Sequence, residues 1–253
     1  MSLIFALKLA LVPSLIGGIT LAGRRWGPAV AGWLSAFPVV AGPVLFFIAM
    51  DQGIEFAANA ATGTLSAVLA ILVFNISYAW AATRHRWQLC LCIAFFAYAL
   101  AVLGLKAWAP SLPVGAVAVL VALFVAQRMF PPAEKASAVT AKSTDMHWRM
   151  LAGAVLVITV THFSSALGPQ LSGVLAMFPV MASVLVAFSH RHSGPAFAIN
   201  LLRGTVTGYY AFAVFCIALA LLLPRVGIAT AFVASLAGAI AVQAISRLYL
   251  QRR

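Results

Sequence analysis

The sequence predicts an all-α polytopic membrane protein with about nine transmembrane helices, arranged as two inverted four-helix repeats joined by one connecting helix. Three observations support this fold. Hydrophobic residues make up 64% of the 253 residues and charged residues only 8%, whereas a soluble globular domain carries roughly 25% charged residues. Apolar runs long enough to cross a bilayer recur along the chain. Two parts of the chain also repeat each other in sequence.

The apolar runs define the expected elements. A membrane-spanning helix needs about 20 mostly apolar residues. Nine such runs occur, at 3–22, 27–49, 56–82, 87–107, 111–129, 148–167, 170–189, 196–223 and 226–247. The polar segment 131–147 has no helical periodicity and predicts a loop. We therefore expect a first four-helix unit at 1–108, a connecting helix and cytoplasmic loop at 109–147, and a second four-helix unit at 148–253.

Charge placement predicts the orientation of these helices. Cytoplasmic loops carry an excess of lysine and arginine. With the N-terminus outside, 13 of the 16 basic residues fall on the cytoplasmic side and three outside. The net charge of +12 does not indicate a nucleic-acid partner, because the basic residues form short runs between apolar stretches instead of one solvated patch. We expect an integral protein of a bacterial inner membrane, with a cytoplasmic C-terminus.

An internal repeat is the most informative feature. Residues 27–64 align without a gap to residues 168–205, at an offset of 141, and 15 of the 38 aligned positions are identical. Membrane composition does not explain the shared prolines, glycines and asparagines. Because a four-helix unit followed by one extra helix re-enters the bilayer from the other side, the two units are expected to be inverted. Inverted repeats occur in many secondary transporters.

Both units carry the pattern Gly-x-Leu-x-x-Phe-Pro, at 32–38 and 173–179. A short glycine-containing polar turn follows, at 51–53 and 190–194, and then a helix that opens with small residues. In this pattern the chain resembles a duplicated version of the small GlpM-type bacterial four-helix membrane proteins. The second unit matches better, because it keeps a basic residue in its turn and Arg203 in the next helix. The resemblance implies the repeat fold and adds little about substrate.

Paired prolines and glycines mark the second helix of each unit. Pro38 and Pro179 each remove a backbone hydrogen bond to the carbonyl four residues back. One interpretation is a broken helix whose freed backbone groups line a substrate-binding site at the repeat interface. The other is a packing kink, and recurrence in both units leaves the two open. For Gly32 and Gly173 we favour close helix packing.

Four polar residues inside apolar runs are further candidates for substrate binding. Arg203 lies about 10 Å into its helix at about 1.5 Å per residue, so it either binds an anion or extends to the cytoplasmic interface. Asn59 and Asn200 occupy matched positions and either contact solute or bond between helices. His162 either relays protons or is satisfied by a neighbouring group.

Acidic residues and catalytic motifs are scarce. The four acidic residues, Asp51, Glu55, Glu134 and Asp145, lie at the expected outer mouth or in the cytoplasmic loop. The sequence has no HExxH, GxSxG or P-loop motif, and no histidine or cysteine cluster with metal-ligand spacing. We therefore expect no enzyme activity, no cofactor and no metal.

Together these features favour a transporter or flippase for a small, anionic or lipid-linked solute, with its site between the repeats near the paired prolines. The alternative is a non-catalytic accessory subunit of an envelope assembly, which needs only packing surfaces. The expected partners are membrane lipids and a small-molecule solute, and a homodimer stays open.

Overall fold

The fold is all-helical over the residues that can be described. A computed structural model describes residues 3–108, 110–132, 145–166 and 179–251, with side chains described at 9–108, 110–132, 146–159 and 179–247. Within these ranges all regular secondary structure is helical, which confirms the all-α prediction. The helices are α1 (Leu3–Trp26), α2 (Pro28–Ser35), α3 (Ala41–Gln52), α4 (Ile54–Ala82), α5 (Trp87–Trp108), α6 (Leu112–Met129), α7 (Asp145–Ala166), α9 (Val180–Val226) and α10 (Ile228–Gln251).

These helical elements do not match the nine predicted spans one to one. The predicted span 27–49 is divided into the short helices α2 and α3, whereas α9 consists of two helical parts that meet at the kink of Gly194, between the predicted spans 170–189 and 196–223. Five described helices are long and apolar enough to cross a membrane: α4, α5, α6, α9 and, over Ile228–Arg247, α10. These long apolar helices are consistent with an integral membrane protein.

The break between α2 and α3 lies at Pro38. Proline has no N–H group with which to continue the helical hydrogen bonds. The carbonyl of Leu34 instead accepts a hydrogen bond from the Phe37 N–H at 3.2 Å, and the Gly42 N–H donates to the Pro38 carbonyl at 2.8 Å. At the aligned position of the sequence repeat α9 begins directly after Pro179, and the Ser183 N–H donates to the Pro179 carbonyl at 2.9 Å. Pro38 and Pro179, which align in the sequence repeat, therefore each precede the start of a helix.

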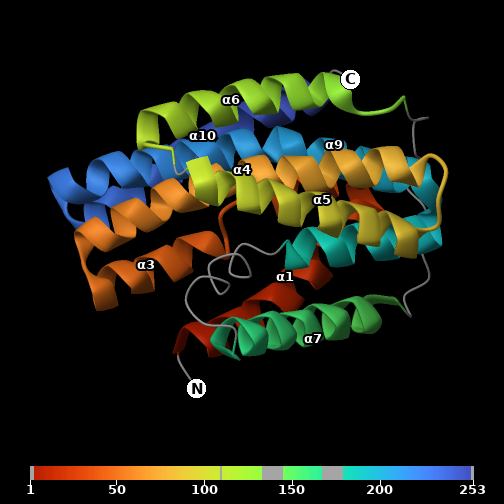
Figure 1. Ribbon diagram of the computed structural model, residues 1–253, viewed down its shortest axis with the longest axis horizontal. Helices are drawn as coiled ribbons and strands as arrows, with labels where there is room; N and C mark the ends of the chain where they lie inside the picture. The colour runs from red at the N-terminus through yellow and green to blue at the C-terminus, as the bar shows by residue number, and fades with distance from the viewer. Residues whose placement is uncertain (1–2, 109, 133–144, 167–178, 252–253) are drawn as a thin grey trace.

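Two glycines at aligned positions of the sequence repeat make the turns that follow. Gly53 separates α3 from α4 with φ 89° and ψ 170°, and Gly194 kinks α9 with φ 84° and ψ 174°. This region of backbone space is essentially restricted to glycine. In Figure 1 α3 leads into α4 at the left end of the molecule, whereas the teal first part of α9 turns back at the right end.

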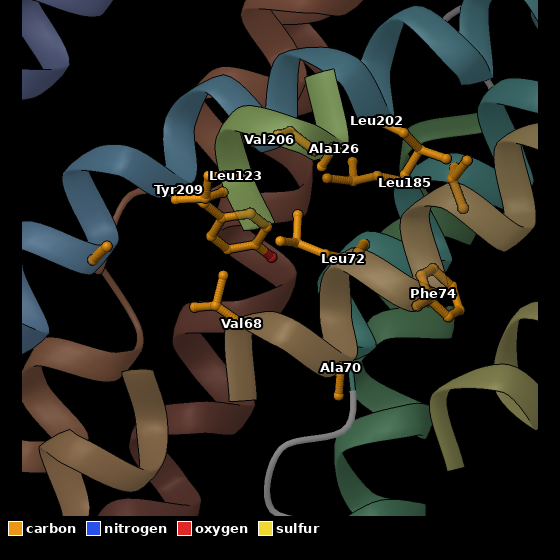
Figure 2. Close-up of a cluster of buried hydrophobic side chains, with 14 of the residues drawn as sticks. Val68, Ala70, Leu72, Phe74, Leu123, Ala126, Leu185, Leu202, Val206 and Tyr209 are labelled. Carbon is orange, nitrogen blue, oxygen red and sulfur yellow. The ribbon is translucent and has the colours of Figure 1, made fainter. Parts of the chain in front are cut away.

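The core lies where α4, α6 and α9 meet. Figure 2 shows apolar side chains of these three helices in one cluster, with the ring of Tyr209 reaching from α9 toward Val68 of α4. The labelled members are Val68, Ala70, Leu72 and Phe74 of α4, Leu123 and Ala126 of α6, and Leu185, Leu202, Val206 and Tyr209 of α9. Most of the apolar stretches of α4 and α9 are buried, so these two helices form the centre of the molecule.

The outer helices α5, α6 and α10 present large apolar side chains outward. Phe96, Val117 and Val233 are each more than 60% exposed. Apolar surface exposed to water is unfavourable by about 25 cal/mol per Å². Lipid removes that cost, so the exposed surface of these helices is consistent with a membrane environment.

Candidate functional site

Gly32 lies at a backbone contact between α2 and α9. A Cβ atom added to Gly32 would overlap the Leu201 carbonyl oxygen, and one added to Gly204 would overlap the Ala29 carbonyl oxygen. Gly208 similarly lies against the backbone of Trp33. Small residues permit this approach, so α2 and α9 lie too close for a solute to pass between them at these positions.

The remaining residues predicted for the site are dispersed. Pro38 and Pro179 are both buried. Asn59 is exposed, whereas Asn200 is partly buried and its side-chain amide donates to the Ala196 carbonyl one turn earlier, at 3.0 Å. The side chain of His162 and the whole of Gly173 lie outside the described residues.

Arg203 contacts the C-terminal end of α6. Its Nη2 donates to the Pro131 carbonyl at 2.9 Å, and its guanidinium group lies 5.8 Å from the centre of the Phe130 ring. A nearby polar pair, Gln127 Nε2 and Thr207 Oγ1 at 2.9 Å, also joins α6 to α9. These contacts show that Arg203 helps to hold the end of α6 against α9.

A cavity lined by two arginines lies elsewhere, where α1, α7 and α9 meet. α1 and α7 pack side by side, and both contact α9 (Figure 1). The cavity measures about 20 Å³, which is room for one or two water molecules. Its polar lining consists of Thr20, Arg24, Arg149, Ser189 and Ser193, and its apolar lining of Ile19, Gly23, Ala31, Leu185, Phe197 and Leu201. Neither Pro38 nor Pro179 is among them.

Arg149 is the most deeply buried charged residue of this lining, with 4% of its surface exposed. Its Nη1 donates to Ser189 Oγ at 3.4 Å, and its guanidinium group lies 5.5 Å from the centre of the Phe188 ring. Arg149 also lies in the first turns of α7, close to the positive end of the helix dipole, where a cation is disfavoured. Burying a guanidinium there is costly, so its position is not explained by helix stability.

The other polar residues that line the cavity differ in exposure and in the hydrogen bonds that they can still form. Arg24 lies in the last turn of α1 and is partly exposed. Thr20 Oγ1 donates to the Ile16 carbonyl of its own helix at 2.7 Å, so its oxygen has only acceptor capacity left. Ser189 accepts from Arg149 and keeps its own proton to donate. Arg24, Arg149 and Ser189 therefore line one small space, and none of its described lining residues is acidic.

The segment of α9 beside the cavity is held from the opposite side by α4. Tyr78 of α4, which is fully buried, has its hydroxyl oxygen 3.1 Å from His190 Nδ1. His192, two residues on, stacks on the Phe188 ring with 6.2 Å between the ring centres. Polar and aromatic contacts thus position the residues on either side of Ser189.

No family model, curated protein or solved structure matches this chain. The candidate site therefore depends on its own geometry. Among the described residues, no three histidine, cysteine or acidic side chains gather as a metal site would require.

Sequence reasoning assigned Arg24 and Arg149 only to topology, and two signals could have found the cavity. Arg149 follows Lys8 by 141 residues, the offset of the repeat, so both units carry a cation at that position. The α9 residues that line the cavity are also spaced four apart, which places Leu185, Ser189 and Ser193 on one helix face before the Gly194 kink and Phe197 and Leu201 on one face after it.

Proposed function

We propose that this chain is a bacterial inner-membrane transporter or flippase-like protein for a small anionic or lipid-linked solute, and that the Arg24–Arg149 cavity is its binding site. The observation that carries the proposal is Arg149, a buried cation that lines a cavity together with a second arginine. Ionisable residues within membrane proteins usually face substrate or ion pathways. The cavity joins the two units, since α1 belongs to the first and α7 and α9 to the second.

Several features support the inverted repeat that this proposal includes. Pro38 and Pro179 each precede the start of a helix, and Gly53 and Gly194 each form a turn with positive φ, at the offset of 141. The contact of α10 with α3 has its counterpart in the contact of α5 with α9. In Figure 1 the equivalent turns after α3 and within α9 lie at opposite ends of the molecule.

The proposed orientation places the N-terminus outside. It is supported by the segments that carry arginines, several of which lie at the same end of the molecule. The turn from α4 to α5, which carries Arg84 and Arg86, and the C-terminal end of α6, which carries Arg128, both lie at the right in Figure 1. The kink of α9, next to Arg191, lies at that end too. We propose that this end faces the cytoplasm, so that the cavity opens near the cytoplasmic interface and not at the midplane.

The transport proposal is tested with purified protein reconstituted in liposomes. Currents on a solid-supported membrane are recorded after concentration jumps of chloride, sulfate, phosphate and small carboxylates, and a fluorescent anionic lipid reports flipping. Wild-type protein should move at least one of these probes. Arg149→Gln should abolish that movement while the protein remains inserted and folded.

Arg191→Gln is the matched control, because Arg191 is exposed on the same segment of α9 and does not line the cavity. It should retain transport. A wild-type protein that is folded and inserted but moves none of the probes would reject transport and leave the accessory-subunit alternative, which the backbone contact of α2 with α9 favours.

A further inference from the structure

Three exposed arginines lie at one end of the molecule, away from the Arg24–Arg149 cavity. Arg84 and Arg86 belong to the turn from α4 to α5, and Arg128 lies in the last turn of α6. Figure 1 shows this turn and the end of α6 at the same end of the molecule. The segments that carry the three arginines, 80–88 and 124–132, contain no acidic residue. Positive charge is therefore concentrated on exposed surface here.

Trp80 of α4 connects these two segments. Its indole Nε1 donates to the Met129 carbonyl at 2.8 Å, so the residue that follows Arg128 is bonded to a side chain four positions before Arg84. The Trp80 side chain is also 54% exposed. Tryptophan is enriched at the level of the lipid headgroups, where its apolar ring and its polar N–H group both find a suitable environment. An exposed Trp80 therefore favours the headgroup level for this end of the molecule.

Arg128 is already oriented by contacts within α6. Its guanidinium group lies 4.0 Å from the centre of the Phe124 ring, and its Nη1 donates to the Phe124 carbonyl at 3.5 Å. A guanidinium group has five N–H donors, so most of them stay available to an external acceptor. Its planar donors match the oxygens of a phosphate group, which they can bind in pairs.

Exposed apolar side chains continue from the arginines along α5 and α6. Each helix has a stripe of them at helical spacing that begins within about one turn of an arginine. On α5 the stripe includes Leu89, Ile93 and Phe96, and on α6 it includes Phe124, Val121 and Val117. The α5 stripe continues to Leu103, a rise of about 21 Å at about 1.5 Å per residue. This exceeds the about 15 Å of hydrocarbon core in one leaflet, so an acyl chain finds apolar contact along its whole length.

We propose that this end of the molecule binds the headgroup of an anionic phospholipid, whose acyl chains follow the stripes of α5 and α6. The ligand needs both parts. A soluble anion would leave the stripes uncovered, and an uncharged lipid would supply no counter-charge to the arginines. A zwitterionic phospholipid is disfavoured because its own cation offsets its phosphate charge. Anionic leaflets attract basic residues near their surface in this way.

This inference goes beyond the proposed function and does not depend on transport. Arg84, Arg86 and Arg128 do not line the Arg24–Arg149 cavity. Variants at these positions therefore separate lipid binding from solute binding.

Binding is measured on the purified, delipidated full chain in uncharged detergent by native mass spectrometry. The probes are dioleoyl phosphatidylglycerol and dioleoyl phosphatidylcholine, whose equal acyl chains make the headgroup the only difference. We expect phosphatidylglycerol to bind more tightly, and its advantage to shrink as the ammonium acetate concentration rises, because salt screens exposed charges. Arg84→Gln, Arg86→Gln and Arg128→Gln should each weaken phosphatidylglycerol binding by about fivefold, the factor that one basic residue near an anionic membrane surface contributes.

Arg225→Gln is the matched control. Arg225 is likewise exposed in the last turn before a break in the chain of helices, and its Nη1 donates to the Leu221 carbonyl four residues earlier, as Arg128 does to the Phe124 carbonyl. The turn from α9 to α10, which carries Arg225, lies at the opposite end of the molecule (Figure 1). Arg225→Gln should leave phosphatidylglycerol binding unchanged. Arg149→Gln should also leave it unchanged, since Arg149 belongs to the cavity.

A phosphatidylglycerol with a photoreactive headgroup locates the site on the wild-type protein, so the inference stays testable if a variant does not insert. Cross-links should fall in segments 80–88 and 124–132 and not beside Arg225. Three results would overturn the inference: equal binding of both phospholipids, an equal loss in Arg225→Gln, or cross-links confined to the opposite end. Normal phosphatidylglycerol binding by a protein that moves no solute in liposomes would reject the proposed transport and support this inference.

Discussion

Arg149 of α7 donates a hydrogen bond to Ser189 of α9 at 3.4 Å. The two residues are 40 positions apart in the sequence, so the bond connects two different helices. The hydroxyl acceptor is neutral, so this bond positions the guanidinium group without cancelling its charge. Ser189→Ala should therefore leave the protein folded and weaken anion binding less than Arg149→Gln does. Calorimetry with the anion identified for the wild-type protein measures both effects, and equal losses would show that the serine itself dominates binding.

Gly32 gives the clearest prediction for stability. Gly32→Ala should destabilise the protein by about 1–3 kcal/mol, because the added Cβ meets the Leu201 carbonyl and α2 must shift away from α9. The free energy of unfolding in mixed micelles measures this. Gly63→Ala is the control, since its Cβ meets nothing within 4 Å inside α4, and alanine there should be neutral or stabilising by about 0.5–1 kcal/mol.

The turn glycines predict a second stability effect. Gly53→Ala and Gly194→Ala should each cost about 1–3 kcal/mol, because a side chain is strained at these φ and ψ values even though the surrounding space is open. Gly104→Ala, in helical α5 with equally open space, should not cost stability. Unfolding in mixed micelles compares the three variants, and an equal response from all of them would contradict backbone strain as the cause.

Tyr78 and His190 should be energetically coupled. Tyr78→Phe removes the hydroxyl that lies 3.1 Å from His190 Nδ1 while it keeps the buried ring, and a loss of about 0.5–1.5 kcal/mol is expected. A double-mutant cycle with His190→Ala isolates this term. A coupling energy near zero would show that the contact contributes nothing to the packing of α4 against α9.

Arg203 is expected to affect structure more than binding. Arg203→Gln should lower stability by about 1–3 kcal/mol by removing the bond to the Pro131 carbonyl, and should leave anion affinity unchanged. Arg128→Gln, at an exposed position of α6, serves as the charge-matched control. Loss of anion binding in Arg203→Gln with normal stability would return this residue to the substrate site.

Much of the fold could be predicted because the signals are local. Proline at position 38 breaks its helix for lack of an N–H group, and glycine at 53 and 194 marks turns that other residues resist. The boundary between the predicted spans 170–189 and 196–223 has the same local origin, since Gly194 interrupts the helical backbone angles of α9 between them.

The candidate site was harder to predict because it depends on tertiary contacts. Arg24 and Arg149 each look like a charge at a helix end, and only the packing of α1 against α7 places them in one cavity. Arg203 looked like the stronger candidate because it lies deep within an apolar run. Its contact with Pro131 depends on where α6 ends, which no local pattern in α9 encodes.

The kink in α9 lies within the wall of the cavity. Ser189 and Ser193 precede Gly194, whereas Phe197 and Leu201 follow it, and both pairs line the same space. The helical segments on either side are held rigid by their own hydrogen bonds. The relative position of the lining residues before and after the kink therefore depends on the two backbone dihedral angles of a single residue, Gly194.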